Sequence, residues 1–243
     1  MQSTPVAIYN CPSRRGPTLF VNNDQFGAAY LMDYAGVQPA TRPTALPDET
    51  RFYDPGKDGN KIAQNNSAFW SFGYPNPQAD AVYDGVIVRT PWRRTNMPPP
   101  DSGPAEGSYL NNVPRPTSFA KVTDGTSKTM MIGEKWVFVD NYPGVLNENG
   151  QPADPSDDHG WCDGWDPDTM RSTFHLPLPD SQPDGLDGQN YWFGSAHSGA
   201  FNAVFADGSV RSVSYDIDPY IFNSLGTRNG TALNESSSTE GVN

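Results

Sequence analysis

A histidine and an aspartate near the end of the chain are the residues that most invite a catalytic interpretation. His197 and Asp207 lie ten positions apart, and Ser195 and Ser198 flank the histidine. A His and a carboxylate can activate a serine nucleophile. However, Asp207 precedes Gly208, and an Asp-Gly pair between two apolar runs satisfies the backbone of a tight β-turn. The pattern therefore favours structural roles, with His197 hydrogen-bonding a neighbouring loop.

A second Asp-Gly pair, Asp124-Gly125, is explained by a turn in the same way. Glu134 follows it within an apolar run, where a charged carboxylate needs a partner because an unpaired buried charge is unfavourable. We expect a basic partner, and a general-base role is the less favoured alternative. The candidate partners are Lys128, Arg171 and Arg211.

The segment 153–168 is rich in aspartate and could hold a cation. Hard cations such as Ca²⁺ collect carboxylate and carbonyl oxygens from loops. The spacing matches no EF-hand, so a solvated acidic loop is the favoured alternative. His159 and His175 could join a transition-metal site, but two separated histidines are usually surface residues. The candidate calcium ligands are Asp157, Asp158, Asp163, Asp166 and Asp168, with Asp154 beside them.

Three tryptophans accompany this acidic segment: Trp161, Trp165 and Trp192. An exposed Trp beside Asp and Asn can form a platform on which a sugar ring stacks. Core packing is the favoured alternative for most of them. Polysaccharide binding is therefore a secondary interpretation.

The chain has two cysteines, Cys11 and Cys162, and no CxxC pair for a structural metal or a redox site. One disulfide and two buried thiols are equally compatible with the sequence. A bridge would close a loop of about 150 residues and could stabilise the fold by up to about 5 kcal/mol. We predict this bridge for protein made in an oxidising compartment, because no third cysteine competes.

The composition is that of a folded, acidic and loop-rich protein. Of 243 residues, 23 are Gly and 24 are Pro, above the average but below the range of disordered chains, and 12% are aromatic. A formal net charge of −12 repels phosphate backbones and anionic lipids. Nucleic acid and membrane surfaces are therefore poor partners, whereas cations and neutral ligands are better ones.

Apolar patterning predicts short strands separated by proline-rich loops. Period-two alternation favours one strand over 28–35, and a further pair of segments resembles a hairpin. Two later apolar runs flank the Asp124-Gly125 turn. The strands predicted up to this point are 28–35, 69–74, 82–88, 119–122 and 129–139.

The C-terminal part predicts a compact β-hairpin formed by 201–205 and 210–217. Its apolar phase slips between Val210 and Val213, which predicts a bulge just after the turn.

A short helix is expected after this hairpin, over 219–225. Asp218 is a good N-cap, Pro219 suits the first helical position, and Gly226 provides a stop. We expect one globular domain over 1–228 and a flexible polar tail over 229–243.

Three segments together resemble a large planctomycete family of prepilin-like proteins of unknown function, also labelled bacterial extracellular solute-binding proteins. The strongest is 193–210, which matches the family's signature of His, nine residues and Asp-Gly. The second is 122–129 with Gly-Glu-Lys at 133–135 behind it. The third is 9–13, which contains Cys-Pro-Ser. The resemblance covers nearly the whole chain.

The resemblance implies an α+β, mostly β, pilin-like fold, in which an N-terminal helix packs on an antiparallel sheet with large loops. It also implies a non-enzymatic, exported structural protein at the cell surface or in a secretion apparatus, whose partners are other pilin-like subunits or secretion machinery. Family members begin with a prepilin cleavage site and a long apolar helix. Because the sequence has neither, we expect an N-terminal segment to be missing. The sheet face beneath it must then be buried by something else or stay exposed as an assembly or aggregation surface.

Overall fold

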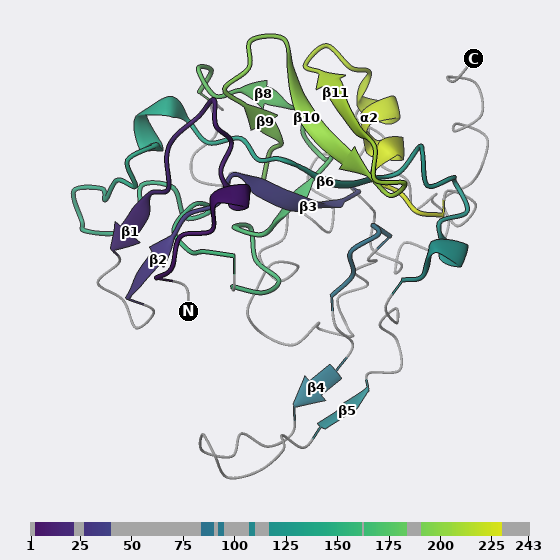
Figure 1. Ribbon diagram of the computed structural model, residues 1–243, viewed down its shortest axis with the longest axis horizontal. Helices are drawn as coiled ribbons and strands as arrows, with labels where there is room; N and C mark the ends of the chain where they lie inside the picture. Colours follow the sequence, from purple (N-terminus) through teal and green to yellow (C-terminus); the bar gives the residue numbers. More distant parts are fainter. Residues whose placement is uncertain are drawn as a thin grey trace.

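The computed structural model describes residues 3–21, 27–39, 84–89, 92–94, 107–109, 117–161, 163–183 and 191–229. These residues form an α+β fold that is mostly β, as predicted (Figure 1). Short strands and loops predominate, with 3-10 helices at Ala7–Tyr9, Phe119–Lys121 and Val139–Asn141.

A central five-stranded sheet organises the fold, in the order β11-β10-β6-β3-β7. Neighbouring strands are antiparallel except β3 and β7, which are parallel. The sheet is therefore mixed, whereas the expected sheet was antiparallel throughout. Its strands are β3 (Tyr34–Gln38), β6 (Met130–Glu134), β7 (Met170–Ser172), β10 (Ala200–Phe205) and β11 (Val210–Ser214).

Three two-stranded pairs lie outside this sheet. The β1-β2 and β4-β5 pairs are antiparallel, and β8-β9 is parallel. Their bounds are β1 (Leu19–Val21), β2 (Ala28–Tyr30), β4 (Trp92–Arg94), β5 (Gly107–Tyr109), β8 (Leu178–Pro179) and β9 (Gly194–Ser195).

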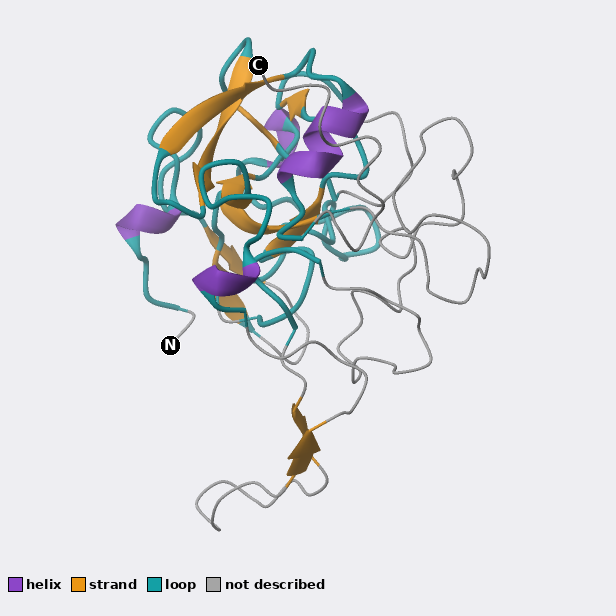
Figure 2. Ribbon diagram, turned by 90° about the vertical axis from the view of Figure 1, so that its right-hand side faces the viewer, coloured by secondary structure: helices purple, strands orange, loops and turns teal. Residues whose placement is uncertain are grey.

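The hydrophobic core lies between one face of the central sheet and the helix α2 (Pro219–Leu225), which Figure 2 shows beside the strands. Phe222 on the helix makes edge contacts with Phe193 and with Phe201 on β10. The Asp218 side chain accepts the first free backbone N–H groups of α2, as its N-cap position predicts. Sheet and helix therefore exclude water together from an aromatic cluster.

Alternation along the strands sends a second set of side chains to the opposite face of the sheet. On β10, Phe201 faces the core, while Asn202 and Val204 face away from it. Ile132 on β6 and Tyr34 on β3 share that opposite face, where they border a cavity. This face is bordered by the segment that contains the 3-10 helix Ala7–Tyr9.

Four predicted strands have a different structure. Residues 129–139 form a strand only over Met130–Glu134 (β6), and Val139 begins a 3-10 helix. Residues 28–35 form the separate strands β2 and β3, because Asp33 between them turns its backbone and carboxylate toward the N-terminal segment. Residues 119–122 form a 3-10 turn instead of a strand, and Phe119 is 71% exposed there, so no core holds it in a sheet. Residues 84–89 form no strand, with a bend over 85–87, and the rest of the predicted hairpin at 69–74 and 82–88 lies outside the described residues.

The C-terminal hairpin and helix are confirmed, but the predicted bulge is in a different place. The β10-β11 register is regular, and the irregularity falls between Val204 and Phe205, opposite β6. Val210 is 66% exposed, so it is not one of the alternating strand residues that face the core. Gly226 ends the helix with φ −82, so no left-handed residue is needed. The expected tail lies outside the described residues beyond 229.

We predict that Gly208→Ala destabilises the fold by about 1 kcal/mol. Gly208 adopts φ +83 in the β10-β11 turn and has nothing within 4 Å of an added Cβ, so the effect is purely one of backbone strain. Gly199→Ala is the matched control, because Gly199 has equally open space and no positive φ. Thermal melts of both variants test this, and equal melting temperatures would contradict it.

Candidate functional site

A network of buried charges fastens the N-terminal segment to the sheet, with Asp33 at its centre. The backbone N–H of Cys11 donates to Asp33 Oδ2 at 2.8 Å. Arg15 Nε lies 3.0 Å from Asp33 Oδ1, and Arg14 Nη1 lies 3.4 Å from the same oxygen. Asp33 is wholly buried, so these contacts replace the water that a charged carboxylate would otherwise require.

Arg14 extends this network toward the end of β8. Its Nε lies 2.7 Å from Asp180 Oδ2, and its Nη2 donates to the carbonyl of Lys135 at 2.7 Å. The Tyr142 hydroxyl also donates to Asp180, at 2.6 Å. Burial and this carboxylate raise the pKa of Tyr142 above its usual range. Arg14 thus joins three distant segments through charge-assisted hydrogen bonds.

Asp157 joins the network to the acidic loop. It accepts a bidentate pair of hydrogen bonds from Arg15, at 2.6 and 2.8 Å, and Lys135 Nζ lies 2.8 Å away. Burial opposes its ionisation, but the two cations prevail and hold the pKa of Asp157 below its usual range. Asp157 is therefore an ionised partner of Arg15 and Lys135 and does not join the other predicted calcium ligands.

The other four predicted calcium ligands converge into a compact cluster. Ligand atoms of Asp163, Asp166 and Asp168 lie within 4.8 Å of one another, and Asp158, His159 and Asp168 form an overlapping group. Asp168 connects the two groups, because its Oδ1 accepts the backbone N–H groups of Asp158 and His159. The acidic loop is thus folded around buried carboxylates, and the favoured interpretation of a solvated loop is wrong.

This cluster carries more negative charge than its neighbours balance. Lys135 Nζ lies 3.9 Å from Asp168 Oδ1, and Arg171 is buried beside the cluster, but the carboxylates outnumber these cations. Burial raises the pKa of Asp168 well above its usual range, and burial with the charge of Asp166 raises the pKa of Asp163 to about 7. Asp168 Oδ2 has no hydrogen-bond partner among the described residues.

The tryptophans do not form a common platform. Trp192 is buried, with His175 stacked on it at a centroid distance of 4.2 Å, and burial lowers the pKa of His175 to about 4. Trp161 is half-buried with its ring 6.1 Å from that of Tyr9, and Trp165 is also half-buried. Core packing therefore accounts for Trp192.

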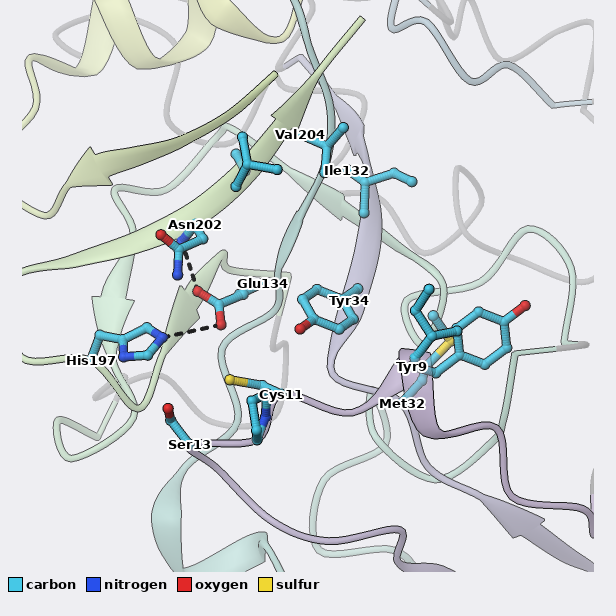
Figure 3. Close-up of a pocket in the computed structure, with 14 residues that line it drawn as sticks. Tyr9, Cys11, Ser13, Met32, Tyr34, Ile132, Glu134, His197, Asn202 and Val204 are labelled. Carbon is cyan, nitrogen blue, oxygen red and sulfur yellow. Dashed lines mark hydrogen bonds and ion pairs between the residues drawn. The ribbon is translucent and has the colours of Figure 1, made fainter. Parts of the chain in front are cut away.

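A cavity of about 670 Å³ lies on the open face of the central sheet (Figure 3). Its walls are largely apolar and come from the N-terminal segment and from β3, β6, β10 and β11. Its polar groups gather on one side, where Glu134, His197 and Cys11 approach one another in Figure 3. The remaining lining includes Ile8, Tyr9, Met32, Tyr34, Ile132, Asn202, Val204 and Val210.

Glu134 is the most buried of these polar groups, with 1% of its surface exposed. Its Oε2 accepts the backbone N–H of Asn202 at 2.7 Å, and its Oε1 lies 3.5 Å from His197 Nε2. The predicted basic partners are not the ones used: Arg211 contacts Asp207, and Arg171 lies beside the acidic loop. His197 contacts a strand residue instead of a neighbouring loop.

Cys11 places a buried sulfur on the same side of the cavity, and it has no disulfide partner among the described residues. Burial raises the pKa of the Cys11 thiol, and a hydrogen bond with Glu134 adds to the shift. Cys162 lies outside the described residues, so its disulfide with Cys11 stays a prediction.

The Asp-Gly pairs lie in turns, away from the cavity lining. Asp207 Oδ1 accepts the backbone N–H and the hydroxyl of Ser209 in the β10-β11 turn. Gly125 has φ +100, and Asp124 Oδ2 accepts the Thr227 hydroxyl at 2.7 Å. Of the residues in the three resembling segments, the structure thus brings together Cys11, Glu134 and His197, and it leaves the Asp-Gly pairs apart from them.

The fold and site define a mixed α+β domain with a buried charge network, an acidic cluster and an open-faced cavity. The chain belongs to a family described as a protein of unknown function (DUF1559), whose model matches residues 1–220. No curated protein and no solved structure matches the chain. Among the described residues, no helix is long and apolar enough to span a membrane.

Sequence reasoning missed the residues of the charge network. Arg14 and Arg15 directly follow Cys-Pro-Ser, and Lys135 directly follows Glu134. A lysine within an apolar run was the available signal, because such a residue must find buried partners. Asp33 and Asp180 carried no comparable local signal.

We predict that Asp33→Ala destabilises the protein by about 3–5 kcal/mol, because it removes one of the two carboxylates that each of the buried Arg14 and Arg15 contacts and breaks the hydrogen bond to the Cys11 backbone. Asp216→Ala is the control, since Asp216 is exposed on the surface and should change stability by less than about 0.5 kcal/mol. Chemical denaturation of both variants tests this. Comparable midpoints for the two would show that the network contributes little.

Proposed function

We propose that this protein is a non-enzymatic, exported structural subunit that associates with like subunits through the open face of its central sheet. The observation that best supports this proposal is the cavity on that face, whose walls are mostly apolar. Among the described residues, one face of the sheet packs on α2, whereas the other is bordered by the N-terminal segment and holds the cavity. The prepilin-like resemblance supports a second subunit of the same kind as the cover.

The rim of the cavity supports a protein partner. Ile8 and Val210 are 79% and 66% exposed, and they line the cavity from the N-terminal segment and from β11. Ile132, Val204 and Met32 continue the apolar surface inside. Exposed apolar patches rimmed by polar residues mark interaction sites in soluble proteins. A second subunit could insert apolar side chains here and bury both walls.

The acidic cluster has a structural part in this proposal, as a calcium site that holds the loop. Opposite oxygens around Ca²⁺ lie up to about 5 Å apart at coordination distances of 2.3–2.6 Å. The ligand atoms of Asp163, Asp166 and Asp168 lie within 4.8 Å of one another, which fits this geometry. A divalent cation would also offset the excess negative charge. Asp168 Oδ2, which has no hydrogen-bond partner among the described residues, could coordinate it.

Solute binding is the second candidate function, because the cavity volume falls within the range of small-molecule sites. A neutral ligand could pack on Tyr34 and hydrogen-bond Asn202 or His197. Burial of Trp192 weakens the polysaccharide version of this alternative. The two functions predict different measurements. Assembly predicts self-association of the protein, whereas solute binding predicts a monomer whose melting temperature rises when a ligand is added.

We predict that the protein self-associates with increasing concentration and that the double variant Ile8→Asp, Val210→Asp is monomeric. Both side chains are largely exposed, so charges there should block docking without disturbing the core. Sedimentation velocity over a concentration series measures this. Phe119→Asp is the control, because Phe119 is equally exposed but does not line the cavity. A wild type that stays monomeric, or a double variant that associates normally, would contradict the proposal.

We predict that calcium at 100 times its dissociation constant raises the melting temperature by about 5–10 °C, corresponding to about 2.7 kcal/mol. Asp168→Asn should abolish this increase. In chelator the same variant should melt at or above the wild-type temperature, because it replaces a carboxyl group whose ionisation is opposed by burial with a neutral side chain, and Asn can still accept the N–H groups of Asp158 and His159.

Two controls make the calcium experiment specific. Asp216→Asn changes an exposed aspartate and should retain the full calcium response. Magnesium should stabilise less, because it requires smaller octahedral geometry. A wild-type melting curve that is unchanged between calcium and chelator would refute the calcium site.

A further inference from the structure

The geometry points to a zinc site formed by Cys11, Glu134 and His197 on the polar side of the cavity, with a fourth coordination position open to the cavity. We propose this site from the convergence of three donors of different chemical types, drawn from distant parts of the chain. The proposal is independent of whether the protein assembles through the same face.

The distances suit a small ion after minor side-chain adjustment. Ligand atoms of the three residues lie within 4.8 Å of one another, and His197 Nε2 lies 3.5 Å from Glu134 Oε1. Bond lengths of about 2.0–2.3 Å place the ligands of a tetrahedral zinc ion roughly 3.3–3.7 Å apart. The His197–Glu134 separation already falls in this range. Figure 3 shows the sulfur of Cys11 and the His197 ring directed toward the Glu134 carboxylate from different sides.

The donor set selects zinc over the hard cations proposed for the acidic loop. Thiolate and imidazole ligands suit zinc and similar transition metals, whereas calcium and magnesium take oxygen ligands. A thiolate and a carboxylate together carry two negative charges, which a divalent ion neutralises. This neutralisation matters here because Cys11 and Glu134 are 2% and 1% exposed, and buried charges require compensation.

Neighbouring groups hold each ligand in place without occupying all its lone pairs. The Asn202 backbone N–H binds Glu134 Oε2, which orients Oε1 toward His197. The Cys11 backbone is fixed by its hydrogen bond to Asp33. The Tyr215 hydroxyl donates to the carbonyl of His197 at 2.9 Å. Such outer contacts orient metal ligands and contribute to affinity.

A cysteine nucleophile explains this arrangement less well. A reactive cysteine needs a lowered pKa and a cationic neighbour. Cys11 is instead 2% exposed and lies beside the carboxylate of Glu134. A carboxylate beside a thiol stabilises the protonated form, whereas a metal ion would use both groups at once. The fourth position of that ion would face the cavity, where water or a ligand of the cavity could occupy it.

Cobalt(II) substitution tests the proposal, because a cysteine thiolate bound to cobalt gives a near-ultraviolet charge-transfer band that oxygen and nitrogen ligands do not. We expect reduced wild-type protein to bind one cobalt ion with this band and zinc to displace it. Cys11→Ser should abolish the band. His197→Gln should weaken metal affinity by about 100-fold or more, since lost outer contacts alone cost about 10–100-fold.

Matched variants separate this site from the other donors. Cys162→Ser should keep the band, and so should His159→Gln, which removes the histidine of the acidic cluster. His197 is 37% exposed, so His197→Gln should keep the wild-type fold even where Cys11→Ser does not. The melting temperature of each variant is measured alongside.

Three results would overturn the proposal. They are the lack of a charge-transfer band in reduced wild type, a band that persists in Cys11→Ser, and an affinity unchanged in His197→Gln. A disulfide found by alkylation and intact mass in protein purified without reductant would also overturn it. The sulfur of Cys11 cannot serve both the predicted bridge to Cys162 and a metal ion.

Discussion

Compensation of buried charge is the constraint on which the rest of this structure depends. Arg15 and Lys135 both bind Asp157, and Arg15 and Arg14 both contact Asp33, with almost no solvent access. Removing one member leaves its partners charged in a poorly polar environment, which is far less favourable than leaving all of them unpaired in water. The network therefore behaves as one unit: it forms when the N-terminal segment, β6 and the acidic loop are all in place.

The same network explains why two different groups of donors remain. By binding Asp157, it takes one carboxylate out of the acidic loop and leaves a cluster around Asp168 in which carboxyl groups outnumber the basic side chains among the described residues. By fixing the backbone of Cys11 through Asp33, it brings a sulfur to the edge of the sheet beside Glu134. One group contains mainly oxygen donors and the other contains sulfur, nitrogen and oxygen. Their chemistry therefore favours different ions.

Features that depend on interactions between residues close in sequence could be predicted from the sequence, and features that depend on distant residues could not. The hairpin around Gly208 and the helix capped by Asp218 were predictable, because turn and cap chemistry act within a few residues. The split between β2 and β3 was not, because it depends on Asp33 binding a segment more than twenty residues away. The candidate calcium ligands were found by composition, but only the fold separates Asp157 from the others. The meeting of distant ligands in the cavity had no local signal beyond the motifs that contain them.

Glu134 connects the proposed assembly face with the proposed zinc site. A subunit that covered the cavity would remove the remaining water from this carboxylate, and an apolar cover could offer no compensating charge. Among the described residues, the backbone N–H of Asn202, the half-exposed His197 and the Cys11 thiol would then be the groups that oppose its desolvation. A zinc ion held with Cys11 neutralises the polar side of the cavity before any cover arrives. Metal binding and association should therefore favour each other, because the ion lowers the electrostatic cost of burying the open face of the sheet.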